Sequence, residues 1–129
     1  MKRTRTTAGF VTAEFVFGLV MAYAVLFFAF NFIAYQYGRG VVRAALDEGT
    51  RRGSRADAPA DACLTRIHRV LDESMGAEFR KQVPDGELSC VVAGTRVTAS
   101  AGFHFHSLLL SVGDLNTTIH ASSHKEVHP

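Results

Sequence analysis

Cysteine is scarce and net charge is low in this sequence. It has only two cysteines, and the motifs CxxC, CxxH and HExxH, which are typical of zinc modules and zinc proteases, are absent. The net charge of +2 is too small for a protein that binds nucleic acid through many phosphate contacts. The 129 residues allow one domain of modest size, and a mean hydropathy of +0.10 is too apolar for a disordered tail.

Basic residues are missing from one long interval. No lysine or arginine occurs between Arg5 and Arg39, and residues 15–34 contain no charged side chain. In a helix these twenty residues cover the ~30 Å hydrocarbon core of a bilayer. A buried core helix is the alternative, but about ninety remaining residues are too few to surround a helix that is apolar on every side. The sequence therefore predicts one transmembrane helix in the lipid bilayer, residues 10–37.

The flanks of this segment predict its orientation. Tyr35 and Tyr37 suit the aromatic belt of a membrane interface. The basic residues are denser before the segment than after it, so the N-terminus is expected in the cytoplasm and the C-terminal part outside the cell membrane. Cleavage of an ordinary secretory signal after residues 22–24, AYA, would cut the apolar segment in half, so this kind of cleavage is not expected.

Glu14 lies just inside the apolar segment, where an uncompensated carboxylate is costly. It either occupies the interface in the first helical turn, where the helix dipole favours an acid, or pairs with a cation. The nine residues before the segment, MKRTRTTAG, are basic and polar and end at Gly9. Glu14 is the fifth residue after that glycine.

A short basic leader, a glycine, a glutamate five residues later and an immediate apolar helix resemble the class III leader of type IV prepilins. More closely, residues 9–15, GFVTAEF, are similar to the start of TadE-like pseudopilins of the Flp/Tad pilus system, above all the actinobacterial type. The resemblance implies that a prepilin peptidase cleaves between Gly9 and Phe10. It also implies that Glu14 pairs with the new amine of Phe10 and so fixes the register of packed helices.

The resemblance further implies a type IV pilin-like α+β fold: a long N-terminal helix with an apolar half and an amphipathic half, a second helix and a small antiparallel sheet. The implied function is structural, as a minor pseudopilin that assembles or primes a Tad-type pilus or secretion apparatus, with no enzyme activity and no cofactor. The implied partners are other pilin subunits through the apolar helix, the prepilin peptidase and an inner-membrane platform protein. Incorporation into a surface pilus is one implied location. The alternative is an uncleaved single-pass membrane protein with an extracytoplasmic binding domain.

Beyond the leader, residues 1–9, and the membrane helix, the sequence predicts two further regions. Residues 38–60 continue the helix with an amphipathic pattern and then become a polar loop, with Gly49, Gly53 and Pro59 ending the helix. Residues 61–129 are expected to form a small extracytoplasmic α+β domain. Its predicted elements are one apolar helical stripe from residue 63 to 79, a turn at 84–86, and strands at 87–93, 95–106 and 115–123.

Cys63 lies on the predicted second helix and Cys90 on the first strand. In an oxidising compartment they are expected to form a disulfide, worth roughly 3–4 kcal/mol in the loop-entropy model. The alternative, two buried thiols, applies only if this domain is cytoplasmic.

Four histidines fall on predicted strands or beside them, and the sequence allows two interpretations of them. His104 and His106 share a strand face, and His120 and His124 have the spacing to share the face of a neighbouring strand, which would suit a transition metal. No carboxylate is expected beside them, so exposed histidines on a solvated face are favoured and no metal site is predicted. Ser107, Ser111 and Asp114 lack any activating sequence context, and no catalytic residue is predicted.

Overall fold

The structure of the chain, a computed structural model, describes residues 8–106 and 114–126. Most of the leader, residues 107–113 and the last three residues lie outside the described residues. Contacts divide the chain into two compact units, Met1–Ala34 and Tyr35–Pro129.

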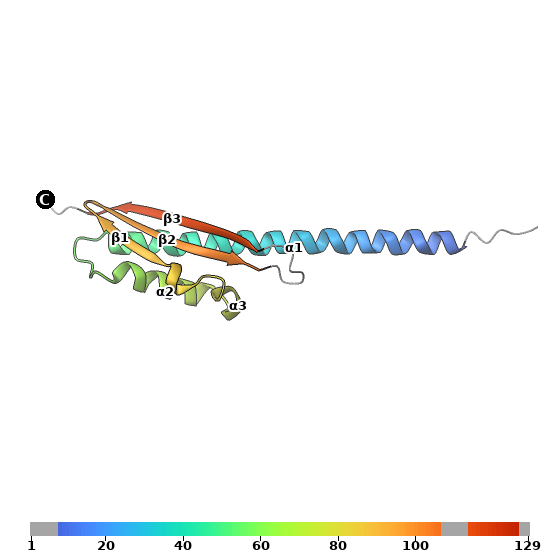
Figure 1. Cartoon of the computed structure of the whole chain (residues 1–129), viewed down its shortest axis with the longest axis horizontal. Helices are drawn as coiled ribbons and strands as arrows, with labels where there is room; N and C mark the ends of the chain where they lie inside the picture. Colours follow the sequence, from blue (N-terminus) through green and yellow to red (C-terminus); the bar gives the residue numbers. More distant parts are fainter. Residues whose placement is uncertain (1–7, 107–113, 127–129) are drawn as a thin grey trace, which may run out of the picture. The chain divides into compact units, whose positions relative to one another are not determined.

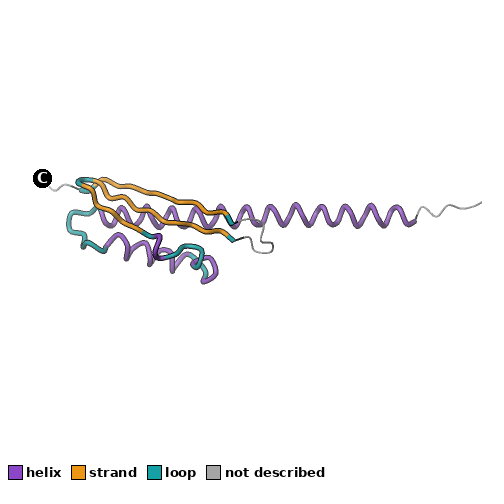
Figure 2. The backbone as a smooth tube through the Cα atoms, in the orientation of Figure 1, coloured by secondary structure: helices purple, strands orange, loops and turns teal. Residues whose placement is uncertain are grey.

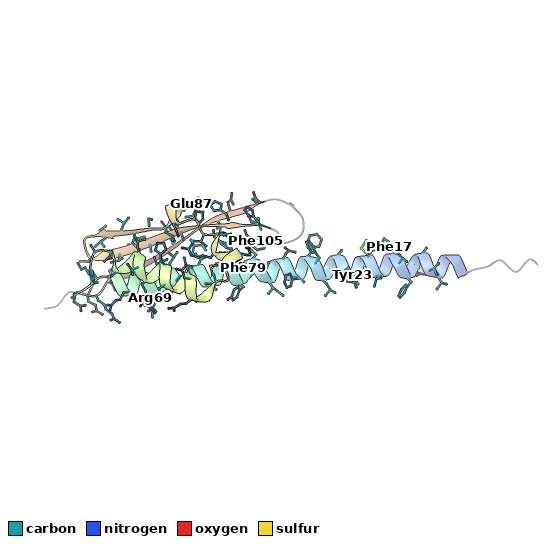
Figure 3. The ribbon with its side chains drawn as sticks, turned by 90° about the horizontal axis from the view of Figure 1, so that it is seen from below. Phe17, Tyr23, Arg69, Phe79, Glu87 and Phe105 are labelled. Carbon is teal, nitrogen blue, oxygen red and sulfur yellow. A yellow bond between two sulfur atoms is a disulfide. The ribbon has the colours of Figure 1, made fainter. Side chains whose placement is uncertain are left out.

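The first unit consists of the N-terminal part of α1, a helix that extends from Ala8 to Gly53 without interruption (Figure 2). The part of α1 in this unit contains no proline, and nearly all of its large apolar side chains are exposed. Phe15, for example, is 71 % exposed. Figure 3 shows Phe17 and Tyr23 pointing away from the helix axis. A helix that is apolar on every side is stable only in an apolar environment. Among the described residues, α1 is the one helix long and apolar enough to cross a membrane, which is compatible with a single-pass anchor.

The second unit has two layers (Figure 1). One layer is an antiparallel sheet with the order β1-β2-β3, and the other contains the last part of α1 together with α2. The element bounds are α2 Ala62–Ser74, α3 Ala77–Arg80, the 3-10 turn η1 Asp85–Glu87, β1 Ser89–Ala93, β2 Arg96–Phe105 and β3 Leu115–His124. A long helix, a second helix and a three-stranded antiparallel sheet make the predicted α+β, pilin-like fold, which is therefore confirmed.

The central strand β2 supplies the sheet's contribution to the core. Its alternate residues are almost completely buried: Val97, Ala99, Ala101, Phe103 and Phe105. The period-2 pattern had predicted this face, and the structure confirms it. On β3, Ala121 lies opposite Ala99 and Ile119 lies opposite Ala101, so the two strands turn matching residues toward the helices.

The end of α1 was predicted wrongly in one respect. Gly49 does not end the helix, which continues to Gly53. Its role is close packing, because a β-carbon at Gly49 would overlap the Ile67 side chain of α2. At Gly53 a β-carbon would lie 2.9 Å from Cβ of Cys63. The two glycines therefore allow α2 to pack directly on the α1 backbone.

The predicted stripe from residue 63 to 79 is divided between two helices. Ile67 and Leu71 are fully buried on α2, but that helix ends at Ser74 and Met75 is extended. Gly76 then precedes the single turn of α3. Glycine is a poor residue for a helix interior, which accounts for the break that the apolar spacing alone did not indicate.

Candidate functional site

The predicted processing site lies at the start of α1. The backbone of Gly9 and Phe10 is helical, and Glu14 follows one turn later with an exposed side chain. Cleavage between Gly9 and Phe10 stays a prediction.

Glu14 is the only charged residue between positions 6 and 38. Within the described part of this chain its carboxylate has no hydrogen-bond or ion-pair partner, and exposed apolar side chains such as Val11 and Phe15 surround it. A carboxylate in such surroundings needs a cation or water when the helix enters an apolar environment. The predicted partner, the amine of Phe10, exists only after cleavage.

Tyr35 and Tyr37 belong to the second unit and contact its core. The Tyr35 ring stacks on Phe103 with a centroid distance of 6.1 Å. The Tyr37 hydroxyl donates a hydrogen bond to the Ser74 carbonyl oxygen, 3.1 Å away, and its ring meets the edge of Phe79. Their place at a membrane interface stays a prediction; in the structure they begin the packing of α1 into the folded unit.

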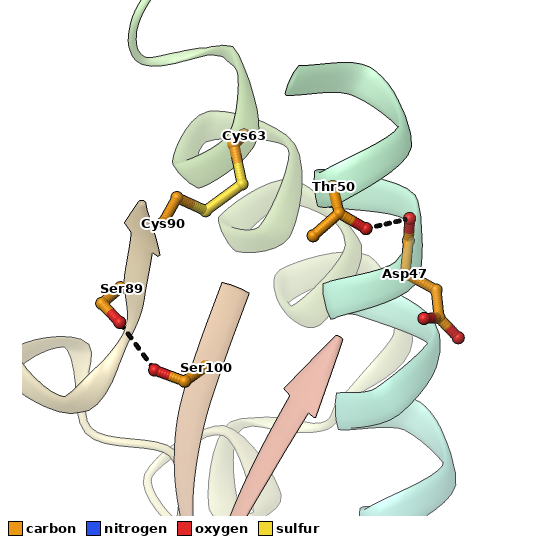
Figure 4. The surroundings of a disulfide bond; sticks show 6 residues. All are labelled: Asp47, Thr50, Cys63, Ser89, Cys90 and Ser100. Carbon is orange, nitrogen blue, oxygen red and sulfur yellow. Dashed lines mark hydrogen bonds between the residues drawn. A yellow bond between two sulfur atoms is a disulfide. The ribbon is translucent and has the colours of Figure 1, made fainter. Parts of the chain in front are cut away.

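The disulfide predicted between Cys63 and Cys90 is present (Figure 4). It joins α2 to the edge strand β1, across a sequence separation of 27 residues and a Cα–Cα distance of 6.3 Å. Cys90 faces the helices because its partner on β2, Ala99, lies on the buried face. The bond therefore holds the sheet edge against α2.

The prediction that no carboxylate lies beside the histidines is wrong. The Glu87 carboxylate accepts a hydrogen bond from Nε2 of His104 at 2.8 Å, and Oδ1 of Asn116 lies 2.8 Å from Nδ1 of the same ring. Gly102 makes room for this contact, since a β-carbon there would overlap the Glu87 carboxylate. The only sequence signal for the contact was a glycine inside a strand, where another group approaches closely.

These contacts raise the pKa of His104. Asn116 contributes most, because its oxygen accepts a proton on Nδ1, and Glu87 adds a charged acceptor for a proton on Nε2. Only the imidazolium carries both protons, so the two acceptors together favour the charged ring.

His106, His120 and His124 are not brought into this cluster. His106 pairs with Asp114 at 2.7 Å. His120 lies opposite Ser100 and His124 opposite Arg96, farther along the sheet. Within residues 8–106 and 114–126, no group of three histidine, cysteine or acidic side chains has a geometry that holds a metal ion. Ser107 and Ser111 lie outside the described residues.

Arg80 is a second polar centre that the sequence did not indicate. Its guanidinium donates to Asp72 at 2.8 Å and to the Val83 carbonyl at 2.7 Å, and it also pairs with Asp85. Burial opposes its charge, but the hydrogen bonds to Asp85 and Asp72 outweigh this and raise the pKa of Arg80. The hydrogen bond from Arg80 in turn lowers the pKa of Asp85. This arginine ties α2 and α3 to the chain that leads into the sheet.

Comparison with protein-family models, with curated proteins and with solved structures found no match for this chain. Its function is therefore argued from its own residues.

Proposed function

We propose that the chain is a TadE-like minor pseudopilin that assembles or primes a Tad (Flp)-type pilus or secretion apparatus. One observation supports this most: α1 is a single element with two contrasting parts. Its first part is exposed and apolar with one carboxylate, Glu14, whereas Val42, Ala45 and Leu46 in its last part are completely buried in the α+β unit. A soluble binding protein has no need for the first part, and a simple anchor has no need for Glu14.

The chemistry begins at the leader. The prepilin peptidase hydrolyses the amide bond between Gly9 and Phe10. The oxygen of the attacking water becomes part of the new carboxylate of Gly9, and the two protons of the water end on the new ammonium of Phe10. The ammonium pairs with Glu14 on its own helix or on a neighbouring one. Such a pair in apolar surroundings specifies the register of packed helices rather than adding much stability.

The partners follow from this chemistry. Other pilin subunits pack on the apolar part of α1, the peptidase acts on the leader, and an inner-membrane platform protein assembles the subunits. In this proposal the N-terminus lies in the cytoplasm, the second unit lies outside the cell membrane, and the processed subunit can enter a surface pilus. Catalysis has no part in it.

Intact-mass analysis of the chain from its native membranes tests the proposal. We expect loss of residues 1–9, which carry Lys2, Arg3 and Arg5, so the formal charge changes from +2 to −1. Gly9→Val should prevent this loss because the peptidase needs a residue without a side chain at the cut, whereas Gly18→Val, within the apolar segment, should not. A wild-type chain that keeps its leader overturns the proposal and favours the uncleaved membrane protein.

A further inference from the structure

An arginine-lined pocket of about 310 Å³ lies between the end of α1 and the start of α2. Arg52 comes from α1, and Thr65, Arg66 and Arg69 come from one face of α2. Asp61 is the one carboxylate in the lining. Three guanidinium groups from two helices therefore surround a space that holds one opposing charge.

The fold neutralises one of these three arginines and leaves the other two without an internal partner. Arg66 pairs with Glu48, with Nη2 3.2 Å from Oε1. Arg52 and Arg69, in contrast, are exposed and have neither a hydrogen bond nor an ion pair within residues 8–106 and 114–126. Figure 3 labels Arg69 on the outside of α2. Arg80, on the same unit, shows the opposite situation, because its guanidinium is held by Asp72 and Asp85.

We propose that this pocket, which we call the arginine pocket, binds an anion that carries more than one phosphate group. A guanidinium presents a planar fork that matches two phosphate oxygens, and it keeps its charge at every physiological pH. Arg52 and Arg69 offer two such forks without an internal partner, beside Arg66 held by Glu48, and this suits a ligand with at least two negative charges. The ligand comes either from a soluble phosphate chain or from the headgroups of anionic lipids. This site does not depend on leader cleavage or on filament assembly.

The test uses the full-length chain in nanodiscs of phosphatidylcholine, titrated with pyrophosphate by isothermal calorimetry. We expect saturable binding that Arg52→Gln and Arg69→Gln each weaken about tenfold or more, since each removes a charge-assisted hydrogen bond. Arg43→Gln is the matched control, because Arg43 is an exposed arginine of α1 outside the pocket. It should leave the affinity within about twofold. All three side chains are exposed, so thermal unfolding should be unchanged.

Two outcomes overturn the proposal: no saturable binding by the wild-type chain, or an equal loss in Arg43→Gln and the pocket variants. Either would mean that the arginines are solvated and merely offset the negative end of the α1 dipole.

A second set of nanodiscs, with phosphatidylglycerol added, distinguishes the sources of the ligand. If headgroups reach the pocket, they compete with pyrophosphate and lower its apparent affinity for the wild-type chain. The weaker affinity of Arg69→Gln for pyrophosphate should then not change when phosphatidylglycerol is added. If the affinity is the same in both nanodiscs, the ligand is a soluble phosphate.

Discussion

The ring of Phe103 on β2 lies so close to Gly38 of α1 that a β-carbon on the glycine would overlap the ring. Phe103 is completely buried, and its other contacts include Tyr35, one turn earlier on α1, and Phe105. The sheet therefore approaches the helix closely at a residue that has no side chain. Interiors are packed too densely for an added methyl group to be accommodated without displacement.

Gly38→Ala should lower the free energy of unfolding by about 1–3 kcal/mol, because the ring has to move away from the helix. Gly40→Ala is the matched control, since nothing lies within 4 Å of a β-carbon at that position on the same helix. It should raise the free energy of unfolding by up to about 1 kcal/mol through helix propensity alone. Chemical denaturation of both variants, followed by near-ultraviolet circular dichroism, measures the difference. Stabilisation by both substitutions would contradict the close packing at Phe103.

The contact of Glu87 with His104 predicts a pH dependence of stability. The folded state raises the pKa of His104, so its contribution is fully present below the unfolded pKa of about 6.5 and is lost as pH rises through the folded pKa. Besides Glu87 and Asn116, the charged group that acts on this ring is Asp114, which also favours the imidazolium. The free energy of unfolding should therefore be lower at about pH 8 than at about pH 6.

Glu87→Gln should weaken this dependence, because the amide no longer offers a charged acceptor to Nε2 of His104. His120→Gln serves as the control: it removes a histidine on β3, exposed and opposite Ser100, and should leave the slope unchanged. Urea unfolding of each variant at the two pH values gives the comparison. An unaltered slope in Glu87→Gln would show that the ion pair does not act on stability.

Local sequence patterns predicted those parts of the fold in which apolar residues recur at the spacing of a strand or a helix. The alternation in β2 identified its buried face because five successive inward residues are apolar and the polar residues fall between them. The role of Gly49 was missed because it depends on Ile67, 18 positions later and on another helix. The same holds for Glu87 and His104, which are 17 positions apart and meet only because Gly102 lacks a side chain. Contacts between two elements cannot be predicted from the periodicity of either element alone.

The disulfide predicts a redox dependence. The bond between Cys63 and Cys90 closes a loop of 27 positions, so its reduction should lower the free energy of unfolding by roughly 3–4 kcal/mol. Both thiols should react with maleimide only after reductant is added. The double variant Cys63→Ala/Cys90→Ala should show the lower stability and no response to reductant. Thiols that react freely in the untreated native chain would contradict the disulfide and would favour a cytoplasmic domain.

The final prediction concerns Glu14 and separates assembly from anchoring. Glu14→Gln removes the charge but nearly keeps the shape of the side chain, so the amine of Phe10 loses its charge-assisted partner. Membrane insertion should be unaffected or easier, because the helix then carries no charge between positions 6 and 38. Cleavage after Gly9 should also persist, since the leader and the glycine are unchanged. Crosslinks to partner pilins and the output of the pilus or secretion system should fall at least tenfold, as expected for loss of a charged hydrogen bond.

The control for Glu14 is Asn31→Ala, at another polar residue of the apolar segment. The Asn31 amide donates a hydrogen bond to the Phe27 carbonyl at 2.9 Å and carries no charge, so its replacement removes no ion pair and should leave assembly unchanged. Membrane fractionation, N-terminal mass and crosslinking yield are measured on the same preparations, which distinguishes a failure of insertion or cleavage from a failure of assembly. If Glu14→Gln inserts, is cleaved and assembles like the wild-type chain, then Glu14 is only an acid in the first turns of a helix, where it interacts favourably with the dipole. Loss of assembly with insertion and cleavage retained is the result that an ion pair between Glu14 and Phe10 requires.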